Sequence, residues 1–247
     1  MRIVTLNIFR GGGDRFERIL EVLKGLSPDV VALQECLGWE DGVRLAEASR
    51  VLGLSQTFLG LARPRPSGLS YHVALLSRWP LANRVTYANP GVNAHCAARA
   101  SVQGVEVLTT HLDGHDEDLR LAEARWLSTL GLQHRRAVLA ADLNSLSPYD
   151  PYPADLDERL ERACILKYGR QARRDVMFEF HRAGWRDALY LRGQPSEWVT
   201  AVREGICFRT DYALVAPTLT AQVEECRVQP VGEDVSDHCP VLLCLSL

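Results

Sequence analysis

Near the C-terminal end of the chain, the segment VSDHCPV at residues 235–241 places an aspartate beside a histidine. Such a pair can be catalytic, can belong to a metal or thiol site, or can be an ordinary polar turn before Pro240. The residues that follow Pro240 form an apolar run, which is typical of a buried strand. The pair therefore stands at the entrance of a predicted strand, and its meaning depends on the polar groups that join it.

Acidic, amide and imidazole side chains recur at or beside other predicted strands. Polar groups at the ends of neighbouring strands can converge on one surface, and burying them elsewhere would be costly unless each found a partner. Carboxylate and amide oxygens suit Mg²⁺ or Mn²⁺ rather than zinc, and histidines can transfer protons. These residue types indicate phosphoryl chemistry with a divalent ion. The set consists of Asn7, Glu35, His111, Asp142, Asn144, Asp211, Asp237 and His238.

Each of these residues also has a purely structural interpretation. Asn7 could cap a strand, Glu35 could be a surface carboxylate, and residues 142–144 could form an Asx turn. Asp211 could simply pair with Arg209. Single matches of this kind are common, but their occurrence together favours a catalytic site.

The hydrophobic pattern predicts the elements that must position these groups. We expect helices over residues 14–26, 40–52 and 117–130, an irregular segment over 146–153, and a mixed helical and looped region that runs on to 185. We expect strands within residues 2–8, 27–35, 71–77, 105–111, 136–145, 207–217 and 239–246. Strands at both ends of the chain, with amphipathic helices between them, indicate an α/β fold in which two sheets pack together with helices outside. No repeat or change of composition divides the chain, so we expect a single domain over residues 1–247.

Composition narrows the class of protein. The chain is 47% hydrophobic and 24% charged, as in ordinary globular proteins, and its net charge of -3 lacks the basic excess of proteins that grip long nucleic acids. Arginine pairs such as Arg63 with Arg65 are typical of solvated loops. The first residues lack a signal peptide and no stretch is long enough to span a membrane, which predicts a cytoplasmic protein. Seven cysteines without a CxxC motif argue against a disulfide framework or a zinc ribbon.

Six segments in order resemble the endonuclease/exonuclease/phosphatase family, which includes DNase I, repair nucleases, neutral sphingomyelinases, deadenylases and inositol polyphosphate 5-phosphatases. The segments are LNI, QE, TTHLD, ADLNS, FRTDY and SDHCPV, and they span nearly the whole chain. The resemblance implies a four-layer α/β sandwich of two packed mixed β-sheets flanked by helices. It also implies cleavage of a phosphoester bond by water with Mg²⁺ or Mn²⁺ as cofactor.

The resemblance assigns the metal site to three residues. Glu35 would be the principal ligand, and Asn7 and Asp237 would complete or support the site. For substrate binding, Arg99 would match an arginine near the phosphate, although it could equally be a surface residue of a strand. Tyr71 would border the pocket.

The resemblance assigns catalysis to five further residues. His238 would contact the scissile phosphate or act as base, with Asp211 behind it to fix its tautomer. Asp142 would orient or deprotonate the attacking water, and Asn144 would donate a hydrogen bond to a charged phosphate oxygen. His111 would stabilise or protonate the leaving side.

Three departures from the patterns of individual family branches narrow the substrate. Phe9 stands where repair nucleases have an acid, and His111 stands where they have a tyrosine, which counts against an abasic-site nuclease. The 5-phosphatase signature has a tryptophan–cysteine pair just before the late aspartate, whereas this sequence has only Cys207 there, which disfavours an inositol phosphatase. Substrate choice should lie in residues 62–68, 149–153 and 197–206, where Tyr149, Tyr152 or Trp198 could stack on a base or pack on their own loops.

We therefore expect a metal-dependent phosphodiesterase whose substrate is a phosphoester. A nuclease acting on DNA or RNA is the alternative within the family, and a lipid or small-metabolite substrate also fits. From a different class, a non-catalytic descendant could bind a phosphorylated ligand or nucleic acid. We infer no obligate protein partner.

Overall fold

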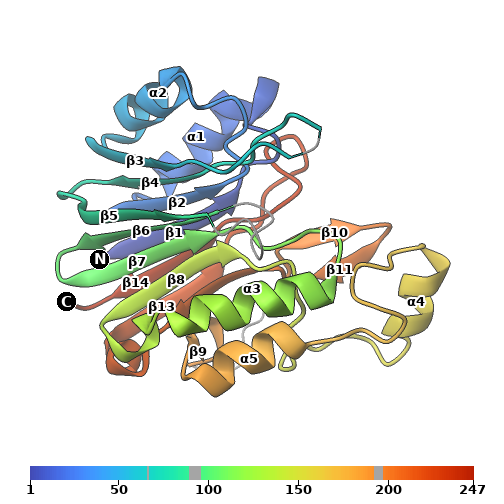
Figure 1. Cartoon of the computed structure of the whole chain (residues 1–247). Coiled ribbons are helices and arrows are strands. Elements are labelled where there is room, and N and C mark those ends of the chain that lie inside the picture. The colour runs from blue at the N-terminus through green and yellow to red at the C-terminus, as the bar shows by residue number, and fades with distance from the viewer. Residues whose placement is uncertain (66, 89–95, 192–196) are drawn as a thin grey trace.

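The computed structural model of the protein describes residues 1–65, 67–88, 96–191 and 197–247, and its centre is a pair of six-stranded sheets (Figure 1). In spatial order, the first sheet contains β13 (Val223–Val228), β14 (Val241–Leu245), β1 (Arg2–Asn7), β2 (Val30–Gln34), β4 (Val73–Ser77) and β3 (Gln56–Gly60). The second contains β5 (Ala82–Tyr87), β6 (Ala97–Val102), β7 (Val105–Thr110), β8 (Ala137–Asp142), β12 (Asp211–Val215) and β9 (Arg186–Asp187). Both sheets mix parallel and antiparallel pairs.

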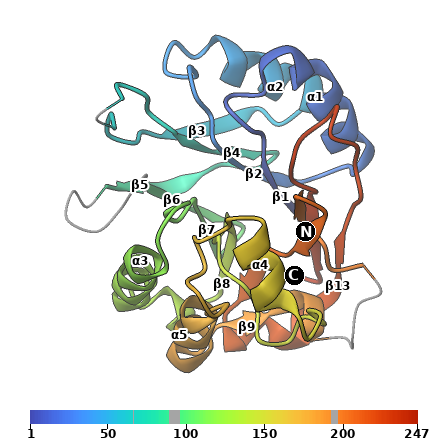
Figure 2. The ribbon, with the colours of Figure 1, turned by 90° about the vertical axis from the view of Figure 1, so that its right-hand side faces the viewer.

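Helices cover the outer face of each sheet, so the fold has four layers (Figure 2). The first sheet is covered by α1 (Phe16–Gly25) and α2 (Val43–Leu52), and the second by α3 (Glu117–Thr129) and α5 (Asp175–Ala183). A short helix α4 (Leu156–Arg162) and the hairpin of β10 (Ala201–Arg203) and β11 (Ile206–Phe208) project at one end of the sandwich (Figure 1). The expected four-layer α/β sandwich is confirmed.

Successive side chains of a strand point to opposite faces of its sheet, either toward the covering helices or toward the other sheet. In β1, Val4 and Leu6 join the apolar cluster under α1, whereas Ile3 packs between the two sheets. With a period of two, Thr5 and Asn7 point to the same side as Ile3, toward the second sheet. The space between the sheets is therefore apolar around Ile3 and becomes polar toward the end of β1.

A buried hydrogen-bond chain marks this change. Gln34 Nε2 donates to Thr5 Oγ1 at 3.0 Å within the first sheet and to Thr109 Oγ1 at 2.8 Å in the second. Buried polar groups need such partners, since an unpaired one costs a large part of its hydration energy. These hydrogen bonds therefore fix the position of one sheet relative to the other, next to the polar strand ends.

Strand direction brings the polar ends together. β1 runs parallel to β2, and β7 runs parallel to β8, so both pairs end at the same edge of the sandwich. β12 runs antiparallel to β8 with Asp211 opposite Asp142, which places the first residue of β12 at that edge. His238, just before β14, joins the same edge because β14 is antiparallel to β1. Topology alone therefore gathers groups from both ends of the chain.

The boundaries of the elements differ modestly from the sequence expectations. The helix expected over residues 14–26 is a 3₁₀ turn at Gly13–Arg15 followed by α1, and the helix expected from residue 40 begins at Val43. The strand expected over residues 207–217 is divided into the end of β11 and all of β12. The strands β3, β5, β6, β9, β10 and β13 are absent from the sequence expectations, because they are short or carry exposed polar residues that weaken the apolar signal. No helix within the described residues is both long and apolar enough to cross a membrane.

A buried arginine clamps the start of β12 beside the polar edge. Arg209 is 1% exposed, and it donates to Asp150 Oδ2 at 3.1 Å and to Asp187 Oδ1 at 3.2 Å. The ion pair of Arg209 with Asp211 considered from the sequence does not form, because Asp211 bonds His238 instead. Arg209 therefore ties β12 to β9 and to the loop that follows β8.

We expect Arg209→Met to destabilise the fold by about 3–5 kcal/mol, because removing one partner leaves two buried carboxylates without a counter-charge. Urea unfolding followed by circular dichroism measures this loss. Arg227→Met is the matched control, since Arg227 forms an exposed pair with Glu225 and its loss should cost below about 1 kcal/mol. Equal effects of the two substitutions would contradict a structural role for the clamp.

Candidate active site

A pocket of about 510 Å³ opens at the edge where the polar strand ends meet. Its walls come from both sheets and from the loops that follow β1, β2, β7 and β8. The residues expected from the sequence that line it are Asn7, Glu35, Tyr71, His111, Asp142, Asn144 and His238. The structure thus brings together seven of the ten residues that the sequence analysis singled out as site residues.

Asn7 joins carboxylates from the two sheets. Its Nδ2 donates to Asp142 Oδ2 at 2.9 Å and to Glu35 Oε1 at 3.2 Å. Its Oδ1 accepts from the backbone N–H of Phe9 at 2.9 Å, which fixes the orientation of the amide. The backbone N–H of Arg10 donates to Glu35 Oε2 at 2.8 Å. Asn7 therefore orients two acids, and its own oxygen is engaged by the backbone.

His238 and Asp211 form a buried pair. His238 Nδ1 lies 2.8 Å from Asp211 Oδ2, a contact that requires one proton between the two atoms. Burial by itself lowers the pKa of His238, but Asp211 and Asp142 outweigh it and raise this pKa to about 10. Burial raises the pKa of Asp211, with Asp142 adding to the effect and His238 opposing it. The imidazole is therefore held as a cation whose Nε2 is left for the pocket.

Asp142 is ionised despite complete burial. Burial would raise its pKa, but His111, His238 and the hydrogen bond from Asn7 overcome this effect and lower the pKa below its usual value. Its Oδ1 accepts from the backbone N–H of Asn144 at 2.9 Å, and His111 Nε2 lies 3.3 Å from its Oδ2. Asp142 is thus a preorganised negative charge between two imidazoles.

Lys167 is a pocket residue that sequence reasoning missed. Its Nζ donates to Asn144 Oδ1 at 3.0 Å, and since an ammonium can only donate, this contact fixes which way the Asn144 amide points. Asn144 Nδ2 then lies 2.8 Å from His111 Nε2 and donates to the Leu112 carbonyl at 3.2 Å. Lys167 follows no strand and has no periodic neighbours, so the sequence held no signal for it.

Five residues that line the pocket and are not glycine have a left-handed backbone. Their φ angles lie between 49° and 59°, a region that residues other than glycine rarely adopt, and they are Phe9, Arg10, Glu35, Asn144 and Cys164. Such conformations cost about 1–3 kcal/mol each and persist where the surroundings impose them, which is common at functional sites. At Gly11, also with positive φ, an added Cβ would lie 2.2 Å from the Leu37 carbonyl oxygen. The loop after β1 is therefore pressed against the loop after β2.

Three expected site residues do not line the pocket: Asp211 lies behind His238, to which it is hydrogen-bonded, and Arg99 and Asp237 lie elsewhere. Arg99 occupies the face of β6 that also carries Ala97, toward α3, where its Nε lies 3.4 Å from Glu106 Oε2. Because side chains alternate along β6, the Arg99 side chain lies on the outer face of the sheet and not in the pocket. Asp237 lines a neighbouring hollow with Cys239 instead of facing Glu35, although its charge helps to raise the pKa of His238.

The loops expected to select the substrate divide into two groups. Residues 62–68 and 197–206 each contribute an arginine to the pocket, Arg65 and Arg203, although Arg65 was expected in a solvated loop. Residues 149–153 do not line it, because Tyr149 stacks on His181 and Tyr152 packs edge-on against Trp198.

One further histidine and one cysteine lie beside the site. His115 is exposed and lines the pocket. Cys239, next to His238, is half-buried, and burial raises the pKa of its thiol, which disfavours a role as nucleophile.

The pocket offers two candidate positions for a cation. Asp142, Asp211 and His238 have ligand atoms within 4.8 Å of one another, but the 2.8 Å hydrogen bond occupies two of those atoms. Glu35 instead presents a half-buried carboxylate to open space, with each oxygen accepting one hydrogen bond and retaining a free lone-pair direction. Mg²⁺ is usually held by one or two carboxylates plus water and phosphate oxygens, so Glu35 fits it better than the imidazole-containing group.

The family model described as "Endonuclease/Exonuclease/phosphatase family" matches residues 4–238, which is nearly the whole chain. The chain belongs to this family. The resemblance carried by the six sequence segments is therefore confirmed, and the convergence of those segments in one pocket is its structural counterpart.

Solved structures of the family share the fold. An AP endonuclease from Archaeoglobus fulgidus is 18% identical with a TM-score of 0.75, and a 3′ phosphatase, NExo, from Neisseria, bound to a product DNA hairpin, is 20% identical with a TM-score of 0.76; both alignments cover all of each chain. An endonuclease/exonuclease/phosphatase from Beutenbergia cavernae is 22% identical with a TM-score of 0.73, covering all of this chain and 71% of that one. No curated protein matches the chain significantly.

Replacing Asp211 by asparagine tests the electrostatic origin of the His238 cation. The substitution keeps the shape and removes the charge, so we expect the pKa of His238 to fall from about 10 toward its ordinary range. Because the folded pKa exceeds the unfolded value of about 6.5, protonation of His238 stabilises the fold fully below that pH, and this contribution is lost as pH rises through the folded value. NMR titration of the imidazole measures the pKa.

Asp234→Asn is the matched control for this titration, because Asp234 is an exposed acid of the same loop. It should leave the His238 titration in place. The assignment fails if the Asp211 and Asp234 variants titrate alike.

Proposed function

We propose that this protein is a phosphodiesterase that depends on Mg²⁺ or Mn²⁺ and cleaves its substrate with an activated water. The observation that carries the proposal is the meeting, in one pocket, of the Glu35–Asn7–Asp142 hydrogen-bond chain and the His238–Asp211 pair. A cation site, an ionised acid and an imidazolium within one pocket are the groups that phosphoester hydrolysis needs. We further propose that residues 1–247 act as one domain without an obligate protein partner.

The metal would be held by Glu35, with Asn7 keeping the carboxylate in place. When bound, the ion would neutralise charge on the phosphate and make the phosphorus easier to attack. Asn7 would act through Glu35 and Asp142, since its amide oxygen already accepts from the Phe9 backbone.

Asp142 would act on the attacking water, and His238 would act on the phosphate. Asp142 is ionised and its carboxylate is fixed by Asn7 and by the Asn144 backbone, so it can orient a water and accept a proton from it. His238 carries its proton at neutral pH because its pKa is raised to about 10. Of the two roles considered from the sequence, we therefore propose that it donates from Nε2 to the phosphate.

His111, with Asn144 beside it, would stabilise or protonate the leaving group. Asn144 Nδ2 lies beside His111 Nε2, and Lys167 keeps the Asn144 amide in this orientation. Because its two Nδ2 hydrogens already face His111 Nε2 and the Leu112 carbonyl, Asn144 would act by orienting the His111 ring. One oriented hydrogen-bonding group in a water-poor site is worth about 3 kcal/mol in the transition state. Tyr71, at the rim, would contact the substrate.

Nucleic acid is the second candidate substrate class. The names of two structural neighbours, an AP endonuclease and a 3′ phosphatase bound to a DNA hairpin, favour it. Phe9 argues against an abasic-site nuclease, because repair nucleases have an acid at this position. Phe9 lines the pocket, and the guanidinium carbon of Arg15 lies 4.7 Å from the centroid of its ring. We therefore propose a phosphodiester substrate and retain a DNA or RNA nuclease as the alternative.

The direct test is hydrolysis of bis-p-nitrophenyl phosphate with Mg²⁺ or Mn²⁺. We expect metal-dependent turnover that His238→Ala reduces by about 10²- to 10⁴-fold, because the substitution removes a positioned proton donor. His134→Ala, which alters an exposed histidine before β8, should retain the wild-type rate. Equal rates for wild type and His238→Ala, or tight binding of phosphate ligands without turnover of any ester, would contradict the proposal.

Lys167 gives a second test of the same machinery. We expect Lys167→Met to lower kcat by about 10- to 150-fold, because a hydrogen bond to a charged group is worth about 1.5–3 kcal/mol and Asn144 loses its fixed orientation. Lys167→Arg retains a donor and should lose less. A kcat that is unchanged in Lys167→Met would show that the Asn144 amide needs no such support.

A further inference from the structure

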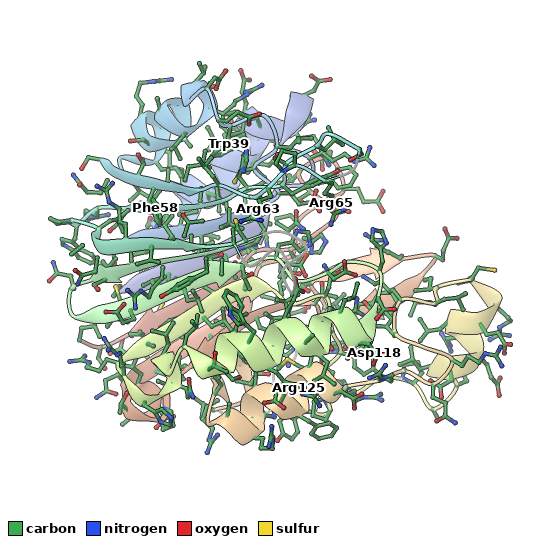
Figure 3. The ribbon with its side chains drawn as sticks, viewed as in Figure 1. Trp39, Phe58, Arg63, Arg65, Asp118 and Arg125 are labelled. Atoms are coloured by element: carbon green, nitrogen blue, oxygen red, sulfur yellow. The ribbon has the colours of Figure 1, made fainter. Side chains whose placement is uncertain are left out.

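The pocket carries more positive charge than one phosphate requires. Arg10 and Arg65 line it on the side of the first sheet, and Lys167 and Arg203 line it from the segments that project beyond the four layers. Figure 3 shows Arg65 on the loop that follows β3, on the side of the molecule from which β10 and β11 project. The cations thus face the opening from several directions.

The backbone around Lys167 is firmly anchored. Arg120 is fully buried and donates from Nη2 to the Lys167 carbonyl oxygen, while its guanidinium also pairs with Glu117 at 2.8 Å. The Lys167 ammonium reaches the pocket over the ring of Tyr168, with Nζ 4.9 Å from the ring centroid. Lys167 is therefore a fixed part of the pocket wall, since its backbone is anchored by a buried arginine.

Arg203 is tied to the catalytic edge. It ends β10, and β10 begins at Ala201, which forms a β-bridge with His238. The Cys239 N–H also donates to the Thr200 carbonyl at 2.7 Å. Arg203 is therefore two residues from a backbone contact with His238, and its position follows that of the catalytic histidine.

Lys167 and Arg203 repel each other. Burial, Arg203 and Arg120 together lower the pKa of Lys167 to about 8 against the opposing charges of Asp142 and Asp211. Within the described part of the chain, neither Lys167 nor Arg203 forms an ion pair. Asp142, an acid of the pocket, is already engaged by Asn7 and two histidines. An anionic ligand would relieve the repulsion.

We propose that Lys167 and Arg203 bind a second phosphate of the substrate, a terminal phosphomonoester next to the diester that is cleaved. This inference rests on the proposed function and narrows it to phosphodiesters that carry an additional terminal phosphate. A pocket of about 510 Å³ has room for such a ligand, since sites for small molecules span about 300–1,000 Å³. Ile165 and Leu166, beside Lys167, offer apolar surface to the group between the phosphates.

Thymidine dinucleotides separate this proposal from the proposed function. TpT, pTpT and TpTp share the same scissile diester and differ only in a terminal phosphate. With Mg²⁺ present, we expect wild type to cleave pTpT or TpTp with a kcat/KM about tenfold above that for TpT, as for a hydrogen-bonded charge pair. Arg203→Gln should remove most of this preference and reduce TpT cleavage much less.

Arg136→Gln is the matched control, because Arg136 is an exposed arginine that precedes β8 at the end opposite to Asp142. It should keep the wild-type preference. Equal cleavage of all three dinucleotides by wild type, an intact preference in Arg203→Gln, or cleavage of a longer oligothymidylate without terminal phosphate as fast as pTpT would each overturn the second-phosphate site. Cleavage of TpT with no preference would still leave the proposed function standing, whereas no turnover of any diester would overturn both.

Discussion

The amide of Asn7 is the contact on which the candidate site depends, because it joins acidic side chains of the two sheets. Asn7 ends β1 in the first sheet and donates to Glu35 beside it and to Asp142 at the end of β8 in the second. A slip of β1 by a single residue within its sheet would turn Asn7 to the opposite face and take it away from both acids. The Gln34–Thr5 hydrogen bond opposes such a slip, and the Gln34–Thr109 hydrogen bond holds the two sheets together beside it.

Charge balance explains why so many ionisable groups can be buried together. Asp142 and Asp211 would each be costly alone, but His238 lies between them, with Nδ1 at 3.9 Å and 2.8 Å from their Oδ2 atoms. Lys167 adds a cation on the far side of Asn144. Acids and imidazoles of the two sheets thus offset one another, whereas Lys167 is only partly offset by Asp142 and Asp211 and, among the described residues, neither Lys167 nor Arg203 forms an ion pair. That asymmetry supports the proposed second phosphate.

The sequence could predict groups that follow strong strands and could not predict those on weak elements. Asn7, Asp142 and His238 stand next to apolar strands, so their convergence followed from strand direction. Lys167 lies in a loop without periodicity, and its place depends on a buried arginine from α3. Arg99 is the converse case, since the sequence left open whether it lies near the phosphate or on the surface of a strand, and the alternation of β6 places it on the face toward α3 beside Glu106.

The position of the cation tests the account most directly. Crystals soaked in Mn²⁺ and measured by anomalous scattering would show where the ion binds, independently of any substrate. We predict a peak bonded to a Glu35 carboxylate oxygen, at about 2.0–2.3 Å, with the His238–Asp211 hydrogen bond retained. A peak bonded to His238 Nδ1 or Asp211, or no peak beside Glu35 at millimolar Mn²⁺, would contradict it.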